Sequence, residues 1–257
     1  MNTHNIIFDL DNTLVKLEGI DFLGQLHQQE AAIARLTVNA MSGKVPLEDV
    51  FKQRLRLAHP STADIAKLAQ QYLANITPGA AGLIRRIQAK GDRVFVITGS
   101  YIQAIMAVTN RLKVPKNQVF ANELLFDKNG RYTGINETVP LWKTGGKQYF
   151  VRYIQKWYPG KTIVIGDGMS DYQAGQIADC FICFAGNTWR KNVIERSTVV
   201  YPYSNIGALY PLLQNIEEVL LPRKQNQKDQ AKKYRHQRVF IGRVLEQTLP
   251  QLTLQHP

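Results

Sequence analysis

Short apolar runs alternate with helix-like patterns along most of this 257-residue chain. Runs such as TIVIG and CFICF are apolar on both faces, which favours strands of a parallel sheet that helices cover on both sides. The alternation of runs and helices predicts βαβ units, so we expect an α/β fold with an open parallel sheet. The expected strands read NIIFDL, RVFVIT, KTIVIGDG, ADCFICF and STVVY.

The spacing of the first two expected strands indicates an inserted segment. Between Gly19 and Asn75 the pattern is helical, in three stretches that read GIDFLGQLHQQEAAIARLTVNAM, PLEDVFKQRLRLA and STADIAKLAQQYLA. The last stretch opens on Ser61 and Asp64, which is the sequence of a helix-capping box. We therefore expect a helical cap at 18–75 inserted into a catalytic core formed by 1–17 and 76–221. Later in the chain, Asn129-Gly130 predicts a hairpin within VFANELLFDKNGRYTGI.

Composition and the N-terminal sequence restrict the environment of the protein. No apolar run is long enough to span a bilayer, and the N-terminus lacks the pattern of a signal peptide. Only two cysteines are present, Cys180 and Cys183, which excludes a disulfide framework and fits a reducing compartment. They lie three apart in one strand and so should face opposite sides of it as packing residues. We expect a cytoplasmic protein.

Four carboxylates stand where expected strands end. Asp9 and Asp11 follow the first strand, and Asp167 and Asp171 follow TIVI. In an open parallel sheet, ligands bind beyond the carboxyl ends of the strands, so these side chains should converge. Carboxylates packed together repel one another unless a cation lies between them. Hard oxygen ligands without nearby His or Cys favour Mg2+.

The same edge of the sheet should carry groups that bind an anion. Thr98 and Gly99 end the strand RVFVI, and Lys147 opens a helix after Gly145-Gly146. A hydroxyl, a backbone amide and an ammonium group can all hold phosphoryl oxygens. Together with a metal and a nucleophilic carboxylate, they predict a phosphoryl-transfer site that uses an aspartyl-phosphate.

The order of these elements resembles the haloacid dehalogenase superfamily of phosphohydrolases. That family has D-x-D-x-T, then Ser or Thr, then Lys, then G-D-G-x-x-D, and this chain has all four elements in order. From about Asn5 to Leu213 the chain is more closely similar to the phosphoserine phosphatases, in stretches such as EGIDFL, AMSGKVP, TGGK, GDGMSD and GNTWRKNV. The resemblance implies a Rossmann-like, doubly wound core with a helical cap.

The resemblance also implies catalytic roles. Asp9 would attack phosphorus, and Asp11 would protonate the leaving oxygen and then activate water. Asp9, the backbone carbonyl of Asp11 and Asp167 would hold Mg2+, with Asp171 supporting them. Thr98, Gly99 and Lys147 would bind the phosphoryl oxygens, which makes Lys147 part of the catalytic machinery.

Four further residues match substrate contacts of that family. Glu18 would meet the substrate ammonium, Arg54 would hold its carboxylate, and Met41 would line the cap side of the pocket. An acid and a guanidinium suit an amino-acid substrate. Ser100 stands where the family usually has a glycine close to the substrate, so the substrate could instead be another small phosphomonoester.

The C-terminal segment is much more basic than the rest of the chain. Residues 222–243 hold eight Lys or Arg and one acid, which supply seven of the twelve net positive charges. A basic tail at 222–257, helical or disordered, could contact an anionic surface or nucleic acid. An inactive core that serves as a binding platform for this tail is the alternative from another functional class.

Overall fold

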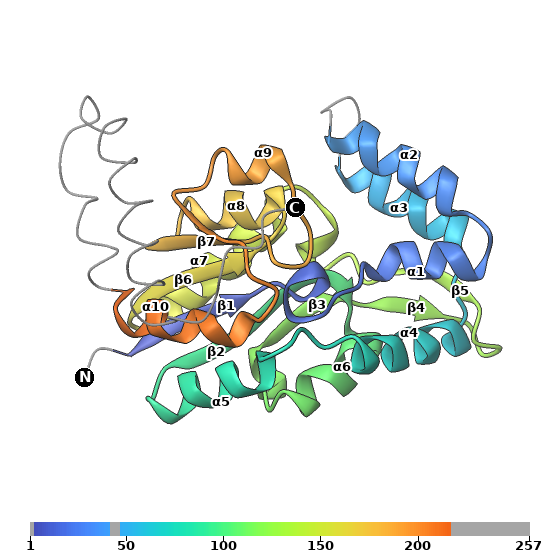
Figure 1. The fold of residues 1–257 in the computed structure, drawn as a ribbon. Coiled ribbons are helices and arrows are strands. Elements are labelled where there is room, and N and C mark those ends of the chain that lie inside the picture. Colours follow the sequence, from blue (N-terminus) through green and yellow to red (C-terminus); the bar gives the residue numbers. More distant parts are fainter. Residues whose placement is uncertain (1–2, 42–46, 217–257) are drawn as a thin grey trace.

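The computed structural model describes residues 3–41 and 47–216, without the side chains of residues 38–41. A six-stranded sheet forms its centre, in the order β3-β2-β1-β6-β7-β8, and every pairing in it is parallel. The structure confirms the expected open parallel sheet (Figure 1). The strand bounds are β1 His4–Phe8, β2 Arg93–Tyr101, β3 Val119–Asn122, β6 Lys161–Gly166, β7 Cys180–Phe184 and β8 Val199–Tyr201.

Helices cover both faces of the sheet and divide the core in two. One apolar cluster contains residues of α5 (Ala80–Ala89), α6 (Ile102–Arg111) and α10 (Tyr210–Gln214). The other contains residues of α7 (Gly146–Trp157), α8 (Met169–Gly175) and α9 (Lys191–Ile194). Cys180 belongs to the first cluster and Cys183 to the second, so the two thiols face opposite sides of β7 as expected. This two-sided burial explains the continuous apolar strands.

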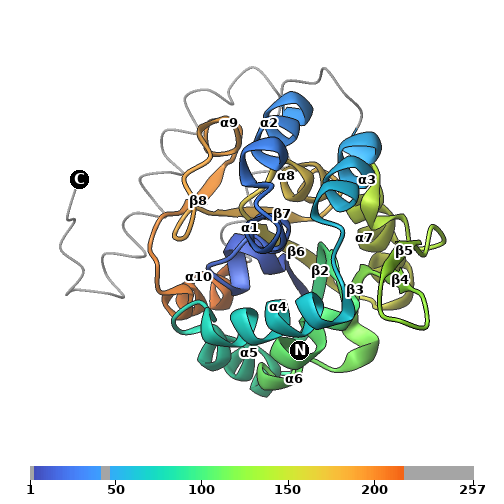
Figure 2. The same ribbon diagram turned by 90° about the vertical axis from the view of Figure 1, so that its right-hand side faces the viewer.

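Between β1 and the core helix α5, the chain forms four further helices, which confirms the helical insertion. They are α1 (Gly19–Leu26), α2 (Glu30–Met41), α3 (Leu47–Ala58) and α4 (Thr62–Ala74). The first three lie beyond the carboxyl ends of the strands, whereas α4 packs along the core helix α6 (Figures 1 and 2). The capping box of Ser61 and Asp64 forms at the start of α4, as the sequence predicts. The domain boundaries at 18 and 75 stay a prediction.

The helical pattern between Gly19 and Met41 is interrupted between α1 and α2. Gln28 has a φ of +56°, and the N–H of Gln29 donates to the carbonyl of Gly24 at 2.9 Å. The N–H of Gln28 donates to the carbonyl of Gln25, which completes a Schellman motif. Glycine usually occupies the left-handed position of this motif. Because this chain has Gln there, its sequence carries no signal for the break.

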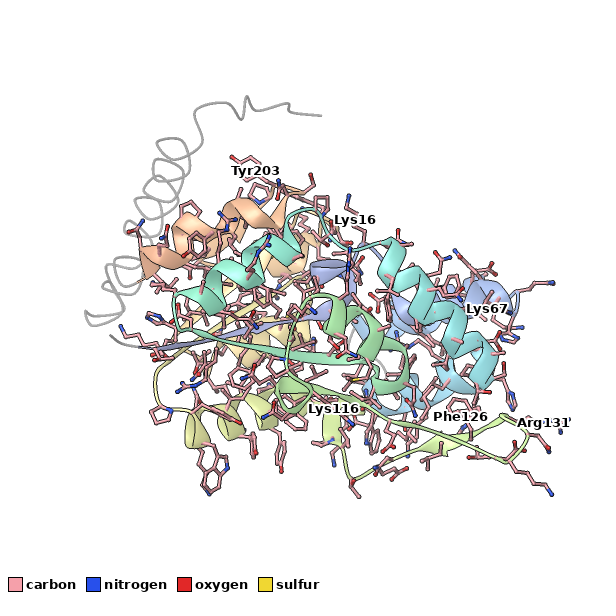
Figure 3. All side chains as sticks on the ribbon, turned by 90° about the horizontal axis from the view of Figure 1, so that it is seen from below. Lys16, Lys67, Lys116, Phe126, Arg131 and Tyr203 are labelled. Carbon is pink, nitrogen blue, oxygen red and sulfur yellow. The ribbon has the colours of Figure 1, made fainter. Side chains whose placement is uncertain are left out.

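The stretch VFANELLFDKNGRYTGI divides between the sheet and a hairpin. Val119–Asn122 pairs with β2 at the edge of the main sheet, and only β4 (Leu124–Phe126) and β5 (Tyr132–Ile135) form the hairpin. Gly130, with a φ of +75°, lies in its turn as expected. The hairpin tip around Arg131 lies beside the start of α4, where the N–H of Thr62 donates to the carbonyl of Gly130 (Figure 3).

The expectations of a basic tail and of no membrane-spanning helix concern residues that lie wholly or partly outside the described ranges. The basic tail at 222–257 lies outside the described residues, and so does any contact it makes. Within residues 3–41 and 47–216, no helix is long and apolar enough to cross a bilayer.

Candidate active site

The expected catalytic side chains gather at the carboxyl edge of the sheet. Asp9 directly follows β1, and Asp167 directly follows the neighbouring strand β6. A tight turn (η1, Leu10–Leu14) then redirects the chain, with Asn12 at a φ of +54°. Asparagine tolerates this left-handed conformation better than most residues. The turn lets Asp9 and Asp11 face the same region although they are two residues apart.

Three carboxylates and one ammonium group form the centre of the site. One oxygen each of Asp9, Asp167 and Asp171 lies within 4.8 Å of the others. The Nζ atom of Lys147 lies 2.8 Å from Asp9 Oδ1 and 2.6 Å from Asp171 Oδ1. All four side chains are buried. The structure thus brings together Asp9, Asp167, Asp171 and Lys147 as the sequence predicts.

Burial controls the protonation of this cluster. It raises the pKa of Asp167 to about 7, although the charge of Arg190 acts against it. Burial and the charge of Asp9 likewise raise the pKa of Asp171 to about 7 against the effect of Lys147. Burial lowers the pKa of Lys147, but the charges of Asp171 and Asp9 outweigh it and raise the pKa overall. Lys147 is therefore charged at neutral pH.

The donor set of Asp9, Asp167 and Asp171 fits a hard divalent cation. It offers only carboxylate oxygens, which Mg2+ prefers over nitrogen or sulfur ligands. Lys147 and Arg190 supply two positive charges for the three carboxylates, and a metal cation between the carboxylates would favour their charged forms. The side chain of Asp11 is not one of this group, and the role of its backbone carbonyl as a ligand stays a prediction.

Two glycines position Lys147 at the start of α7. Gly145 has a φ of +83°, which side chains other than glycine rarely adopt. A Cβ on Gly146 would lie 2.1 Å from the carbonyl oxygen of Pro140, so the close approach of the two backbones requires glycine there. The pair turns the chain sharply and aims the next side chain into the cluster.

The end of β2 provides the expected anion-binding groups. The Thr98 hydroxyl oxygen accepts a hydrogen bond from the N–H of Ser100 at 3.1 Å, and both residues are buried. The Gly99 carbonyl is fixed by the Asn122 side chain at 2.8 Å. Apart from Gly99 itself and its two chain neighbours, no described residue has an atom within 4 Å of the position that a Cβ on Gly99 would take. Space for a ligand therefore opens beside this backbone.

Asp11 differs in its environment from Asp9. Burial raises its pKa well above the ordinary range, and the charges of Glu18 and Asp9 raise it further. A hydrogen bond from Tyr72 acts in the opposite direction. Asp11 Oδ2 accepts from the N–H of Gly19 at 3.4 Å, whereas Oδ1 is buried and makes no hydrogen bond within the described part of the chain. The raised pKa favours the protonated form of this carboxyl group, which could then act as a proton donor.

The inserted helices bring two of the expected substrate residues near the site. Glu18 Oε2 accepts from the side chain of Asn12 at 2.8 Å and lies 3.5 Å from Arg190. The charge of Arg54 lowers the pKa of Glu18, while burial, the larger effect, raises it. Arg54 donates to Thr37 at 3.4 Å, and its buried Nε has no partner among the described residues. The side chain of Met41 lies outside the described residues.

Two residues of the site, Arg190 and Tyr72, were not predicted from the sequence. Arg190 donates to Asp167 Oδ2 at 2.7 Å and also faces Glu18, so it joins the core to the insertion. Arg190 lies within GNTWRKNV, one of the stretches on which the resemblance rests. It does not follow an expected strand, so its position gave no sign of a role in the site. Tyr72 lies near the end of α4, and its hydroxyl is 2.6 Å from Ser100 Oγ. A tyrosine in an amphipathic helix gives no signal that separates it from ordinary core.

Comparisons with known proteins show the family to which the chain belongs. The family model for haloacid dehalogenase-like hydrolases matches residues 6–176. Phosphoserine phosphatase of Mus musculus is 38% identical over 193 residues, which cover 75% of this chain and 86% of that protein. Phosphoserine phosphatase of Homo sapiens is 37% identical over the same shares. The chloroplastic phosphoserine phosphatase of Arabidopsis thaliana is 36% identical over 73% of this chain and 65% of that protein.

Solved structures share the fold. A phosphoserine phosphohydrolase-like protein from Francisella tularensis superposes with a TM-score of 0.72 at 24% identity, over 84% of this chain and 99% of that one. A phosphoserine phosphatase structure with a phospho-aspartyl intermediate analogue gives a TM-score of 0.69 at 23% identity, over 85% and 99%. At such identities, the likeness concerns the fold alone.

Proposed function

The chain belongs to the haloacid dehalogenase-like hydrolases, and from this premise we propose that it is a Mg2+-dependent phosphoserine phosphatase. It is a phosphatase enzyme, as its curated relatives are. The proposed reaction hydrolyses O-phospho-L-serine to L-serine and phosphate, which would complete L-serine biosynthesis. The observation that carries the proposal is the buried group of Asp9, Asp167 and Asp171 with Lys147, beside a raised-pKa carboxyl group at Asp11.

Asp9, Asp167 and Asp171 are the side chains that would hold Mg2+. When bound, the ion neutralises the carboxylates and the phosphoryl oxygens, so that a negatively charged nucleophile can approach a negatively charged phosphate. Lys147, Thr98 and the Gly99 backbone would bind phosphoryl oxygens from the other side.

In the first step, a carboxylate oxygen of Asp9 attacks phosphorus. The bond between phosphorus and the serine oxygen breaks, and an aspartyl-phosphate forms on Asp9. The leaving serine oxygen takes the proton of Asp11 and departs as the neutral hydroxyl of serine. A carboxyl group that is protonated at neutral pH suits this task, and the environment of Asp11 raises its pKa in that direction.

In the second step, Asp11 acts as a base. Its carboxylate accepts a proton from water, and the water oxygen attacks phosphorus. The bond between phosphorus and Asp9 breaks, phosphate leaves, and both carboxyl groups return to their starting forms. Burial of Asp9, Asp167 and Asp171 limits the contact of the reacting groups with bulk water.

Glu18 and Arg54 support serine as the leaving group. An amino acid offers one ammonium and one carboxylate, for which an acid and a guanidinium are the complements. The buried Arg54 Nε without a described partner is a donor that a substrate carboxylate could accept from.

Phosphate release from L-phosphoserine tests the proposal. The purified chain would be assayed with Mg2+ and with EDTA, beside phosphothreonine, phosphoethanolamine, phosphocholine and p-nitrophenyl phosphate. The D9N variant serves as the blank because an amide is a poor nucleophile. A Mg2+-dependent preference for phosphoserine is the expected result. Activity on p-nitrophenyl phosphate but not on phosphoserine would support the proposed mechanism but favour another small phosphomonoester as the substrate. Full activity of D9N would contradict the role of Asp9 as the nucleophile.

A further inference from the structure

We propose that the outer face of α7 is a docking surface for an anionic membrane. This outer face consists of Tyr149, Arg152, Tyr153, Lys156 and Trp157, and all five residues are exposed. The three aromatic residues keep 56%, 41% and 60% of their surface accessible to solvent, in chain order. Exposed apolar side chains that adjoin one another often mark an interaction site. The inference is independent of the proposed function.

The spacing of these residues places them in two adjacent rows along α7. Tyr149, Tyr153 and Trp157 recur every four residues, so they form one row about 12 Å long. Arg152 and Lys156 form a second row directly beside the first. The Nζ atom of Lys156 lies 5.0 Å from the centre of the Trp157 ring, which brings the two rows together. The outer face is thus aromatic along one side and basic along the other.

The opposite side of α7 packs against the core. Val151 and Ile154 are fully buried there. The ring of Phe150 stacks on Phe120 of the edge strand β3, with 4.6 Å between the ring centres. The ring of Tyr153 also meets Phe120 edge-on at 5.9 Å. The core therefore holds α7 in place, and the outer face points away from it.

The charge and chemistry of the outer face select the partner. The sequence of α7, GKQYFVRYIQKW, contains no acid, so Arg152 and Lys156 have no acidic neighbour on their own helix. Anionic lipid headgroups attract basic residues that lie close to the membrane surface. Tyrosine and tryptophan suit the level of the headgroups, because each has an apolar ring and a polar edge. The outer face is therefore complementary to an anionic bilayer on which α7 lies flat.

Charge and shape disfavour three other partners. A second copy that packed through the same face would bring Arg152 and Lys156 close to the same basic residues. The segment 222–243 of this chain has eight Lys or Arg and one acid, so it too would be repelled. Single-stranded nucleic acid is bound in a groove that follows its backbone, whereas the outer face of a single helix is convex.

Vesicle flotation with the full chain tests the proposal. Vesicles of phosphatidylcholine are compared with vesicles that also contain phosphatidylglycerol, in about 100 mM NaCl. The chain should bind the anionic vesicles at least about tenfold more strongly. The double variant Arg152→Glu/Lys156→Glu should lower this binding at least about tenfold. The double variant Tyr153→Ser/Trp157→Ser should lower it at least about threefold, because the rings no longer enter the headgroup layer.

The matched control is the double variant Arg85→Glu/Arg111→Glu. It changes the net charge by the same amount, at exposed positions of α5 and α6, and these helices cover the other face of the sheet. Binding to anionic vesicles should fall less than about twofold. Equal losses in the two charge variants would assign binding to the total charge or to the basic tail, and would overturn the role of α7. An unchanged Tm in circular dichroism shows that each variant folds.

The fluorescence of Trp157 gives a second readout. Its emission, measured as the difference between the unsubstituted chain and Trp157→Phe, should move to shorter wavelengths when anionic vesicles are added. A chain that does not bind these vesicles would refute the proposal, and binding of oligo(dT) in their place would assign the face to nucleic acid. A dimer in sedimentation velocity that Tyr153→Ser/Trp157→Ser abolishes would assign the face to a second copy and equally overturn the proposal.

Discussion

Replacing Lys147 by methionine removes the only lysine that contacts the carboxylate cluster within the described residues. Methionine keeps most of the side-chain volume but no charge. The change leaves Asp9 and Asp171 without their ammonium partner, close to each other and to Asp167. Breaking a buried ion pair by removing one partner typically costs about 3–5 kcal/mol, because the remaining charge stays buried. We expect a loss of that order in the metal-free protein at pH 8.

The loss should depend on pH in a direction that the cluster determines. The pKa of Lys147 is raised, so the lysine is charged at every pH from 5 to 8 and adds no pH dependence of its own there. Asp167 and Asp171, with pKa values raised to about 7, take up protons as the pH falls below that value. Protonated carboxyl groups no longer repel one another, so at pH 5 the loss should shrink to about 1–2 kcal/mol.

Urea unfolding of both proteins in EDTA at pH 5 and pH 8 measures the two losses. Lys156→Met is the matched control, since Lys156 lies exposed on the same helix α7, and it should change stability by less than about 0.5 kcal/mol. Mg2+ should restore part of the stability of Lys147→Met at pH 8. An equal loss at both pH values would refute the electrostatic reasoning and indicate that Lys147 acts through packing alone.

Three further predictions concern other parts of the molecule. Arg54→Ala should raise KM for phosphoserine at least tenfold and change KM for p-nitrophenyl phosphate little, and steady-state kinetics with equal effects would argue against a carboxylate clamp. In EDTA the raised pKa values of Asp167 and Asp171 should make the protein less stable as the pH rises from about 4 to 7, so saturating Mg2+ should raise Tm more at pH 8 than at pH 5 in a thermal-shift series. Gln28→Gly should stabilise the protein by about 0.5–1 kcal/mol in urea unfolding because of its positive φ, while Gln25→Gly inside α1 should destabilise it by about as much.

The sheet could be predicted because its strands are buried on both faces. The β-branched and aromatic runs of β1, β2, β6, β7 and β8 differ plainly from the helical periodicity between them. The break at Gln28 could not be predicted, because its left-handed conformation is stabilised by hydrogen bonds to Gly24 and Gln25 and not by glycine. The strand at Val119–Asn122 was ambiguous for another reason: its sequence continues without a pause into the hairpin.

The site could be predicted where its residues follow strands. Asp9, Thr98 and Asp167 are found by one rule, since the carboxyl ends of parallel strands share an edge. Arg190 and Tyr72 obey no such rule, because a loop and an inserted helix bring them to the site through tertiary packing. Their partners lie 23 and 28 residues away along the chain, and no local spacing encodes those contacts.

The packing of α4 along α6 has a consequence for how enzymes of this kind can be recombined. A chimera that exchanges residues 18–75 for the corresponding helices of a relative would carry Tyr72 away and leave Ser100 behind. Ser100 would then face the side chain that the relative has in place of Tyr72. A chimera that is meant to transfer substrate preference should therefore exchange Ser100 together with the helices. The reason is that the contact between Tyr72 and Ser100 joins two distant parts of the chain.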